Sequence, residues 1–318
     1  MNPYRYCCVQ IIALTALLFS GTVVRAQTCT VQISDMNFGA AVDTLSGAAT
    51  DTTAALTYNC SGGDPADRVL ICVHLEDGSV PGSGGSRRMA GGGSYLNYQI
   101  YQSADRTVVW GSASSSTSPP PIAAIIGGDG TASGQMTLYG RLFGGQSTAE
   151  AAAYVSTFSG GNAEARYRVT DDNDCTSMAG MPTAAVSFAV EAVVAKDCIV
   201  ATQAVNFGAH GSLQHNVDAT GSVSVQCTPA TDYTIKLNGG NADGASTARQ
   251  MSKGSETVAY DLYRDGARSQ HWGDSEGSVA ADIGNGSEQM HTVYGRVPPQ
   301  PTPTAGTYTD TVIVTVDY

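Results

Sequence analysis

The chain has 318 residues, of which 14% are charged, and a formal net charge of −12 at pH 7. A net negative charge of this size argues against nucleic acids and anionic membrane surfaces as partners, because both repel acidic proteins. The 37 glycines and the scarcity of helical periodicity favour an all-β protein whose short alternating strands are joined by glycine-rich turns.

The first 26 residues are predicted to form a signal peptide. Arg5 precedes an apolar segment at residues 9–19, and Ala26 closes a small-residue cleavage site. The apolar segment is too short to predict a membrane span. Cleavage after Ala26 removes Arg5, Arg25 and no acidic residue, which takes the net charge from −12 to −14. The mature chain is therefore expected to be exported.

The mature sequence contains two copies of one domain. Residues 29–40 (CTVQISDMNFGA) recur as residues 198–209 (CIVATQAVNFGA). The later matches keep the same order: Cys60 with Cys227, Met89 with Met251, residues 97–101 with residues 259–263, Trp110 with Trp272, and residues 139–141 with residues 294–296. A single repetition at this length indicates two domains rather than a solenoid. We predict an N-terminal domain at residues 27–194 and a C-terminal domain at residues 195–318.

Six cysteines remain once Cys7 and Cys8 leave with the signal peptide. Disulfides are the default in an exported chain with an even number of cysteines. The repeat places two pairs at equivalent positions and leaves two cysteines of the first copy to pair with each other. The predicted bridges are Cys29–Cys60, Cys198–Cys227 and Cys72–Cys175.

The two copies differ at their ends. Residues 306–318 (GTYTDTVIVTVDY) alternate as a strand with one apolar face, formed by Val312, Val314, Val316 and Tyr318. The first copy continues past the equivalent segment and adds another strand-like run at residues 185–194, which has no counterpart in the second copy. We therefore expect the second domain to lack its last strand. The apolar face should line a groove that a strand from another chain fills.

Several motifs resemble the spore coat protein U domain family, which includes subunits of archaic chaperone–usher pili. They are a cysteine followed after seven residues by Asn-Phe-Gly, a central Trp-Gly, a Tyr-Gly-Arg strand, and the closing segment at residues 305–318. The first copy departs from the closing motif after Tyr154. The resemblance implies immunoglobulin-like β-sandwiches of which the C-terminal one lacks its last strand. It also implies donor-strand complementation, first by a periplasmic chaperone and then by the next subunit's N-terminal strand, with an outer-membrane usher as a further partner.

The resemblance also implies a position at the pilus tip. Only Gln27 and Thr28 precede Cys29 in the mature chain, which is too short for a donor strand. A two-domain subunit that accepts a strand without giving one resembles a tip adhesin. We expect export through the periplasm to the surface of a Gram-negative bacterium, and a role in attachment and biofilm formation.

Apolar loops of the first domain are the predicted adhesive residues. Counting strands back from residues 185–194 predicts that the connections at residues 77–94, 111–132 and 170–183 share the end farthest from the second domain. Their apolar residues are Val80, Pro81, Pro119, Pro120, Pro121, Ile122, Ile125, Ile126, Met178, Met181 and Pro182. Exposed apolar tips favour binding to an abiotic or host surface. The alternative is that the three isoleucines fold back and cap the core.

Other functions remain open in the sequence. One alternative is a non-adhesive structural pilus or spore-coat-like subunit that only assembles. The other is a carbohydrate-binding lectin tip, which would use Arg87, Arg88 and residues 171–174. An enzyme is not expected. The Gly-x-Ser-x-Gly match at residues 273–277 lies outside the strand-to-helix turn that such a nucleophile requires. The five histidines lack metal-ligand spacing, so neither a metal nor a cofactor is predicted.

Overall fold

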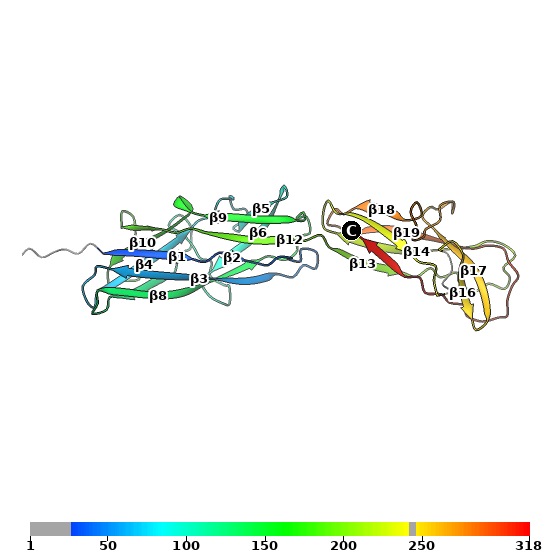
Figure 1. Cartoon of the computed structure of the whole chain (residues 1–318), viewed down its shortest axis with the longest axis horizontal. Helices are drawn as coiled ribbons and strands as arrows, with labels where there is room; N and C mark the ends of the chain where they lie inside the picture. The colour runs from blue at the N-terminus through cyan, green and yellow to red at the C-terminus, as the bar shows by residue number, and fades with distance from the viewer. Residues whose placement is uncertain (1–26, 242–245) are drawn as a thin grey trace, which may run out of the picture.

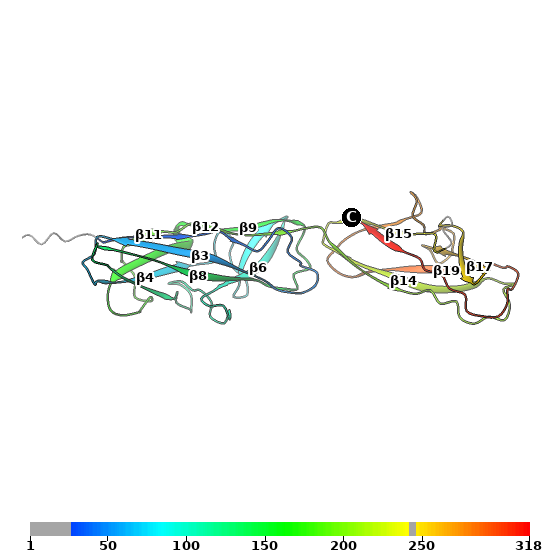
Figure 2. The same cartoon turned by 60° about the horizontal axis from the view of Figure 1, so that its bottom comes forward.

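The computed structural model describes residues 27–241 and 246–318, so the predicted signal peptide lies outside the described residues. Two β-sandwiches follow each other end to end, and the turned view shows the same arrangement (Figures 1 and 2). Strands β1 to β12 form the sheets of domain one, and β13 to β20 form the sheets of domain two. The predicted all-β fold is confirmed.

Domain one contains an eight-stranded sheet in the order β1-β3-β8-β6-β5-β9-β12-β2. Its strands are β1 (Thr28–Ile33), β2 (Met36–Asn37), β3 (Thr50–Ser61), β5 (Arg87–Gly91), β6 (Ser94–Tyr101), β8 (Thr131–Leu142), β9 (Ala152–Phe158) and β12 (Phe188–Val194). Side chains of β1 alternate strictly between exposed and buried, as expected for a strand with one face on the core.

A second, four-stranded sheet in the order β11-β10-β4-β7 closes domain one. Its strands are β4 (Arg68–Leu75), β7 (Pro121–Ile125), β10 (Ala163–Val169) and β11 (Thr183–Ala185), and a 3-10 turn, η1 (Gly160–Asn162), leads into β10. Unlike β1, β4 is buried on both faces, because a loop covers the outer side of this sheet.

Domain two repeats the same plan with fewer strands. One sheet has the order β13-β14-β19-β17-β16 and the other the order β18-β15-β20. The bounds are β13 (Cys198–Gln203), β14 (Val217–Cys227), β15 (Asp232–Leu237), β16 (Arg249–Lys253), β17 (Glu256–Tyr263), β18 (Ala280–Ile283), β19 (Gln289–Val297) and β20 (Val314–Asp317).

Equivalent tryptophans lie at the centre of both cores. Trp110 and Trp272 are each 1% exposed or less. The indole nitrogen of Trp110 donates to the Val73 carbonyl at 2.7 Å, and that of Trp272 donates to the Ile235 carbonyl at 3.0 Å. Both tryptophans thus anchor the same strand of their sandwich, which agrees with the predicted duplication.

All three predicted disulfides are present. Cys29–Cys60 joins β1 to β3, and Cys198–Cys227 joins the equivalent β13 to β14. Cys72–Cys175 connects β4 to the loop after β10 and closes a separation of 103 residues. The first two bridges are therefore part of the repeated fold, whereas the third belongs to domain one alone.

Candidate functional site

In domain one, the last strand completes the sandwich. β12 pairs antiparallel with β9 along its length and parallel with β2. Its inward side chains, together with one residue that precedes it, are at most 5% exposed: Val186, Phe188, Val190, Ala192 and Val194. The strand then leads directly toward domain two (Figure 1). Five alternating apolar side chains thus fill a continuous groove between the two sheets.

In domain two, the equivalent groove is open. β20 pairs with β15 on one edge, and within the described residues no strand pairs with its other edge. The preceding segment contacts β16 through a single bridge between Ser252 and Thr309. The place that β11 and β12 occupy in domain one therefore has no occupant among the described strands of domain two.

Equivalent side chains around the groove are more exposed in domain two than in domain one. Val31 in β1 is 4% exposed, whereas its counterpart Val200 in β13 is 40% exposed. Phe38 is buried and its counterpart Phe207 is only half-buried. The predicted groove residues Val312, Val314 and Val316 are half-buried and pack on the core, while Tyr318 is 54% exposed. Domain two thus presents a groove with an apolar floor to solvent.

One part of this groove is polar. Asp310 accepts hydrogen bonds from the Tyr260 hydroxyl at 2.7 Å and the Asn241 amide at 2.8 Å. Burial raises the pKa of Tyr260, and the adjacent Asp310 carboxylate raises it further. The equivalent residue in domain one is Ser156, which lies opposite Val190 of β12. A strand filling domain two would therefore cover a carboxylate at a place where domain one buries a serine.

The predicted adhesive residues divide into exposed and buried positions. β7 pairs with β4, which places Ile122 (5% exposed) in the core, followed by Ile126 (2%), while Ile125 (57%) points outward. Of the prolines before Ile122, Pro119 is buried, Pro120 half-buried and Pro121 exposed. The prediction of an exposed finger is therefore wrong for Pro119, Ile122 and Ile126. Pairing with β4 makes residues 121–125 an edge strand, and alternate side chains of this strand point into the core.

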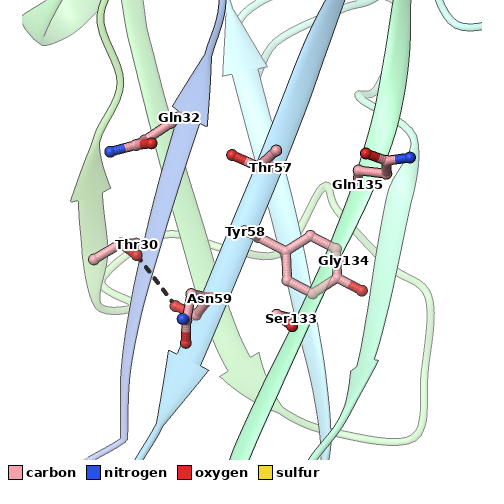
Figure 3. Close-up of a pocket in the computed structure, with 8 residues that line it drawn as sticks. All are labelled: Thr30, Gln32, Thr57, Tyr58, Asn59, Ser133, Gly134 and Gln135. Carbon is pink, nitrogen blue, oxygen red and sulfur yellow. Dashed lines mark hydrogen bonds between the residues drawn. The ribbon is translucent and has the colours of Figure 1, made fainter.

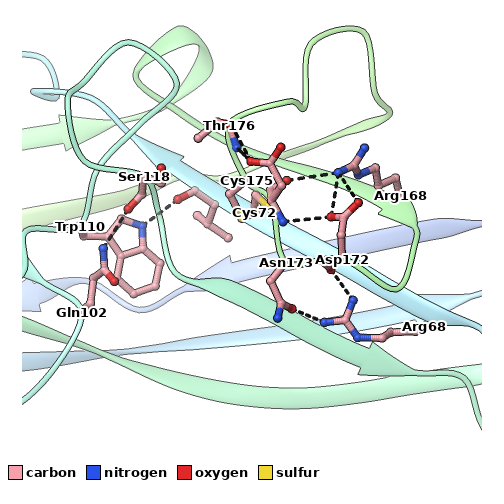
Figure 4. The surroundings of a disulfide bond; sticks show 12 residues. Arg68, Cys72, Gln102, Trp110, Ser118, Arg168, Asp172, Asn173, Cys175 and Thr176 are labelled. Carbon is pink, nitrogen blue, oxygen red and sulfur yellow. Dashed lines mark hydrogen bonds and ion pairs between the residues drawn. A yellow bond between two sulfur atoms is a disulfide. The ribbon is translucent and has the colours of Figure 1, made fainter.

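The loop at residues 170–182 lies across the outer face of the four-stranded sheet. Cys175 fixes it to β4, and Met178, only 1% exposed, packs against Leu70 and the disulfide. The Arg68 guanidinium donates to the Thr170 carbonyl at 2.9 Å. It also donates to the Asp172 carbonyl at 2.5 Å (Figure 4). The predicted exposure of Met178 is therefore wrong, because the disulfide holds this loop against the outer face of the sheet. Met181 is half-buried on this cluster and Pro182 is exposed.

The connection at residues 77–94 does not reach the distal end, by which we mean the end of domain one opposite domain two. It contains β5, which runs toward domain two. A Cβ on Gly92 would lie 2.9 Å from the Cβ of Ala152, and Ala152 pairs with Val194 beside domain two. Val80 is half-buried and Pro81 exposed, both well away from that end. The predicted grouping of three connections is therefore wrong for this one.

The described residues contain no group of three or more His, Cys, Asp or Glu side chains that could hold a metal ion. Nor does that part of the chain contain a helix long and apolar enough to cross a membrane.

Comparison with known proteins agrees with the duplicated fold. The model of the spore coat protein U domain family matches residues 15–160 and 184–315. The chain belongs to this family. Its relative Protein U of Myxococcus xanthus is 36% identical over 126 residues, which cover 36% of this chain and 70% of Protein U. The two-copy arrangement is therefore a tandem of spore coat protein U domains.

One solved structure shares the fold across both domains. The complex of the chaperone CsuC with the tip adhesion subunit CsuE, from archaic chaperone–usher Csu pili of Acinetobacter baumannii, matches with a TM-score of 0.54. The identity is 18%, over 92% of this chain and 100% of the matched chain. The CupB6 tip adhesin of Pseudomonas aeruginosa is also similar, at 12% identity and a TM-score of 0.40 over 92% of this chain and 95% of that one.

The residues of the lectin alternative have structural roles in this spore coat protein U tandem. Arg87 is 5% exposed and donates to the Trp110 carbonyl at 2.9 Å. Arg88 lies over the Tyr95 ring at 4.3 Å. In the loop at residues 171–174, the Arg168 guanidinium binds Asp172 at 2.9 Å. These side chains hold the fold together and do not converge on one pocket, so they do not support that alternative.

Proposed function

We propose that this protein is the tip subunit of a chaperone–usher pilus and that domain two accepts a donor strand from another subunit. The observation that carries the proposal is the contrast between the two copies. The groove of domain one holds five buried side chains of its own last strand, whereas the equivalent groove of domain two is open to solvent. Membership of the spore coat protein U domain family and the likeness to a chaperone-bound tip subunit support it.

The partners follow from the physics of strand addition. A free β20 edge offers main-chain hydrogen bonds, and the apolar floor offers pockets for every second side chain of an extended peptide. In this proposal a periplasmic chaperone occupies the groove first. The N-terminal strand of the next subunit replaces it at an outer-membrane usher, and the protein reaches the cell surface at the pilus tip.

Co-expression in a bacterial periplasm tests this assignment. We expect the chain to aggregate when expressed alone, because the open groove exposes apolar side chains and an unpaired strand edge. With its chaperone it should purify as a soluble one-to-one complex, measured by size-exclusion chromatography with light scattering. A monodisperse monomer obtained without any chaperone would contradict the proposal.

Attachment is the proposed role of domain one. Ile125 and Val169, at 57% and 53% exposed, lie at the distal ends of β7 and β10, the two strands that flank β4 in the four-stranded sheet. The exposed Pro182 follows the loop that the disulfide fixes to the same sheet. Burying such side chains against an abiotic or host surface stabilises contact by about 25 cal/mol per Å². Many pili acting together multiply this weak contact, which favours biofilm formation.

A double variant, Ile125→Asp with Val169→Asp, tests the adhesive surface. Both side chains point into solvent, so the fold should be retained while attachment of piliated cells to polystyrene falls at least about tenfold, because two apolar contacts are lost. Val155→Asp is the matched control, since Val155 is 43% exposed on the side of domain one. Equal attachment by the double variant and the wild type would favour a structural subunit that only assembles.

A further inference from the structure

Nine exposed side chains form a regular grid on the outer face of β1, β3 and β8. Strand pairing aligns them in three rows of three: Thr28–Ser61–Thr131, Thr30–Asn59–Ser133 and Gln32–Thr57–Gln135. We call this grid the neutral face. Neighbouring strands are about 4.8 Å apart and alternate residues about 6.7 Å apart, so the grid presents hydroxyl and amide groups at regular intervals.

The neutral face carries unused hydrogen-bonding capacity and no charge. Its three amide side chains, Gln32, Asn59 and Gln135, make no side-chain hydrogen bond to any described residue. Thr30 donates to the Asn59 main-chain carbonyl at 3.3 Å. A shallow depression of about 560 Å³ lies among two of the rows and is also lined by Tyr58 and Gly134 (Figure 3). The amide groups around it are available to a ligand.

The fold does not require this composition, because the second copy lacks it. Inward positions are kept between the copies, as in Cys29 with Cys198 and Val31 with Val200. The outward positions of β3 keep uncharged polar counterparts, such as Ser224 for Thr57 and Gln226 for Asn59, but those of β1 and β8 do not. Counterparts of the grid include Ile199 for Thr30, Ala201 for Gln32, Glu288 for Ser133 and Met290 for Gln135. The same strands therefore tolerate apolar and charged residues at these sites, so an uncharged polar surface is particular to domain one.

We infer that the neutral face binds an uncharged polysaccharide lying on the sheet. Sugar hydroxyls both donate and accept hydrogen bonds, as amide and hydroxyl side chains do. The nine side chains offer no charge to pair with a charged ligand, and the carboxylate beside them, Asp129, which accepts from the Thr131 hydroxyl at 2.9 Å, would repel an anionic polymer. The net charge of −12 acts in the same direction. A face without large apolar side chains is also a poor site for an apolar surface. This site is separate from Ile125 and Val169 and does not depend on the groove of domain two.

A triple variant, Gln32→Ala, Asn59→Ala and Gln135→Ala, tests the inference in the full mature chain, purified with its chaperone where required. The probes are three neutral polymers of different linkage: dextran, mannan and hydroxyethylcellulose. We expect at least one to retard the wild-type protein in affinity electrophoresis. The triple variant should bind it at least about tenfold more weakly, since three hydrogen bonds are lost. The matched control is Gln203→Ala with Ser224→Ala and Gln226→Ala on domain two, which should bind as the wild type does.

Several outcomes would overturn the inference. They are no binding to any of the three polymers, equal binding by the triple variant, or binding to dextran sulfate in preference to dextran. A wild-type dimer that the triple variant abolishes, measured by sedimentation velocity, would assign the face to contact between copies instead. Unchanged chaperone binding and far-UV circular dichroism would establish that the triple variant is folded. Failure of the proposed pilus role would leave these measurements interpretable, because the face lies wholly in domain one.

Discussion

A variant with a second copy of residues 183–194 joined after Tyr318 by a short glycine-rich linker is expected to be a stable monomer without any partner. In domain one the Tyr167 amide donates to the Pro182 carbonyl at 3.1 Å, so the ends of consecutive strands lie opposite each other. Tyr318 is the counterpart of Tyr167. A short linker therefore suffices to return the added strand along the free edge of β20.

The size of the effect follows from the five side chains that fill the groove of domain one. Burying an apolar side chain contributes about 1.5–3 kcal/mol, and the entropy lost by ordering the added strand offsets part of this gain. New main-chain hydrogen bonds to β20 add to the favourable side. We expect domain two to gain on the order of 5 kcal/mol in its free energy of unfolding. The added strand should thus have the largest effect of the changes considered.

Urea unfolding followed by tryptophan fluorescence measures this gain, and size-exclusion chromatography measures the monomer. The control carries Phe188→Asp and Val190→Asp in the added copy only, which keeps the length and the linker but places charges in the apolar groove. It should behave like the parent chain and still require a chaperone. If both variants are equally soluble and stable, the groove of domain two does not accept a strand, and the basis of the pilus proposal is lost.

The repeat made the architecture predictable, because the two copies constrain each other. Matching Cys29 with Cys198 and Cys60 with Cys227 located the first two strands of each domain and two of the bridges, and left Cys72 to pair with Cys175. The difference between the copies was also predictable, since only the first copy has the strand-like run at residues 185–194. Among the described residues of domain two, no strand pairs with the corresponding edge of β20. Those inferences rest on inward-facing residues, which a shared fold preserves.

The loops of domain one were less predictable, because they have no constraining counterpart. Residues 119–126 are apolar throughout, so the sequence does not indicate which side chains face the core. Pairing with β4 determines this, and it places Ile122 inward and Ile125 outward. Strand β5 was missed because consecutive arginines are unusual in a buried strand, and Arg87 is tolerated there only by its hydrogen bonds. The connection at residues 77–94 was placed at the wrong end because the count omitted β5 and assumed that consecutive strands run antiparallel, whereas β4 and β5 both run toward domain two.

The groups that surround the buried arginine of domain two make a strong second prediction. Arg249 is 0% exposed and donates to the carbonyls of Leu237 and Trp272, each at 2.9 Å, and to that of Asn238. It also pairs with the Asp261 carboxylate at 3.1 Å. Domain one repeats these contacts around Arg87, with Gln99 in place of the aspartate. The arrangement is therefore a structural part of the repeated fold.

Arg249→Met should lower the free energy of unfolding of domain two by about 3–5 kcal/mol, because it removes the cation that pairs with the buried Asp261 carboxylate and the donor to three buried carbonyls. The strand-completed chain described above is the form in which to measure it, by urea unfolding. Arg296→Met is the control, since Arg296 pairs with Asp218 at 2.7 Å near the surface and should cost only about 0–1 kcal/mol. Similar losses in the free energy of unfolding for both variants would mean that water replaces Arg249 as the hydrogen-bond donor to these carbonyls. The larger loss for Arg249 would mean that its hydrogen bonds hold the end of β15 to the Trp272 segment, and so stabilise the sandwich on which the groove is built.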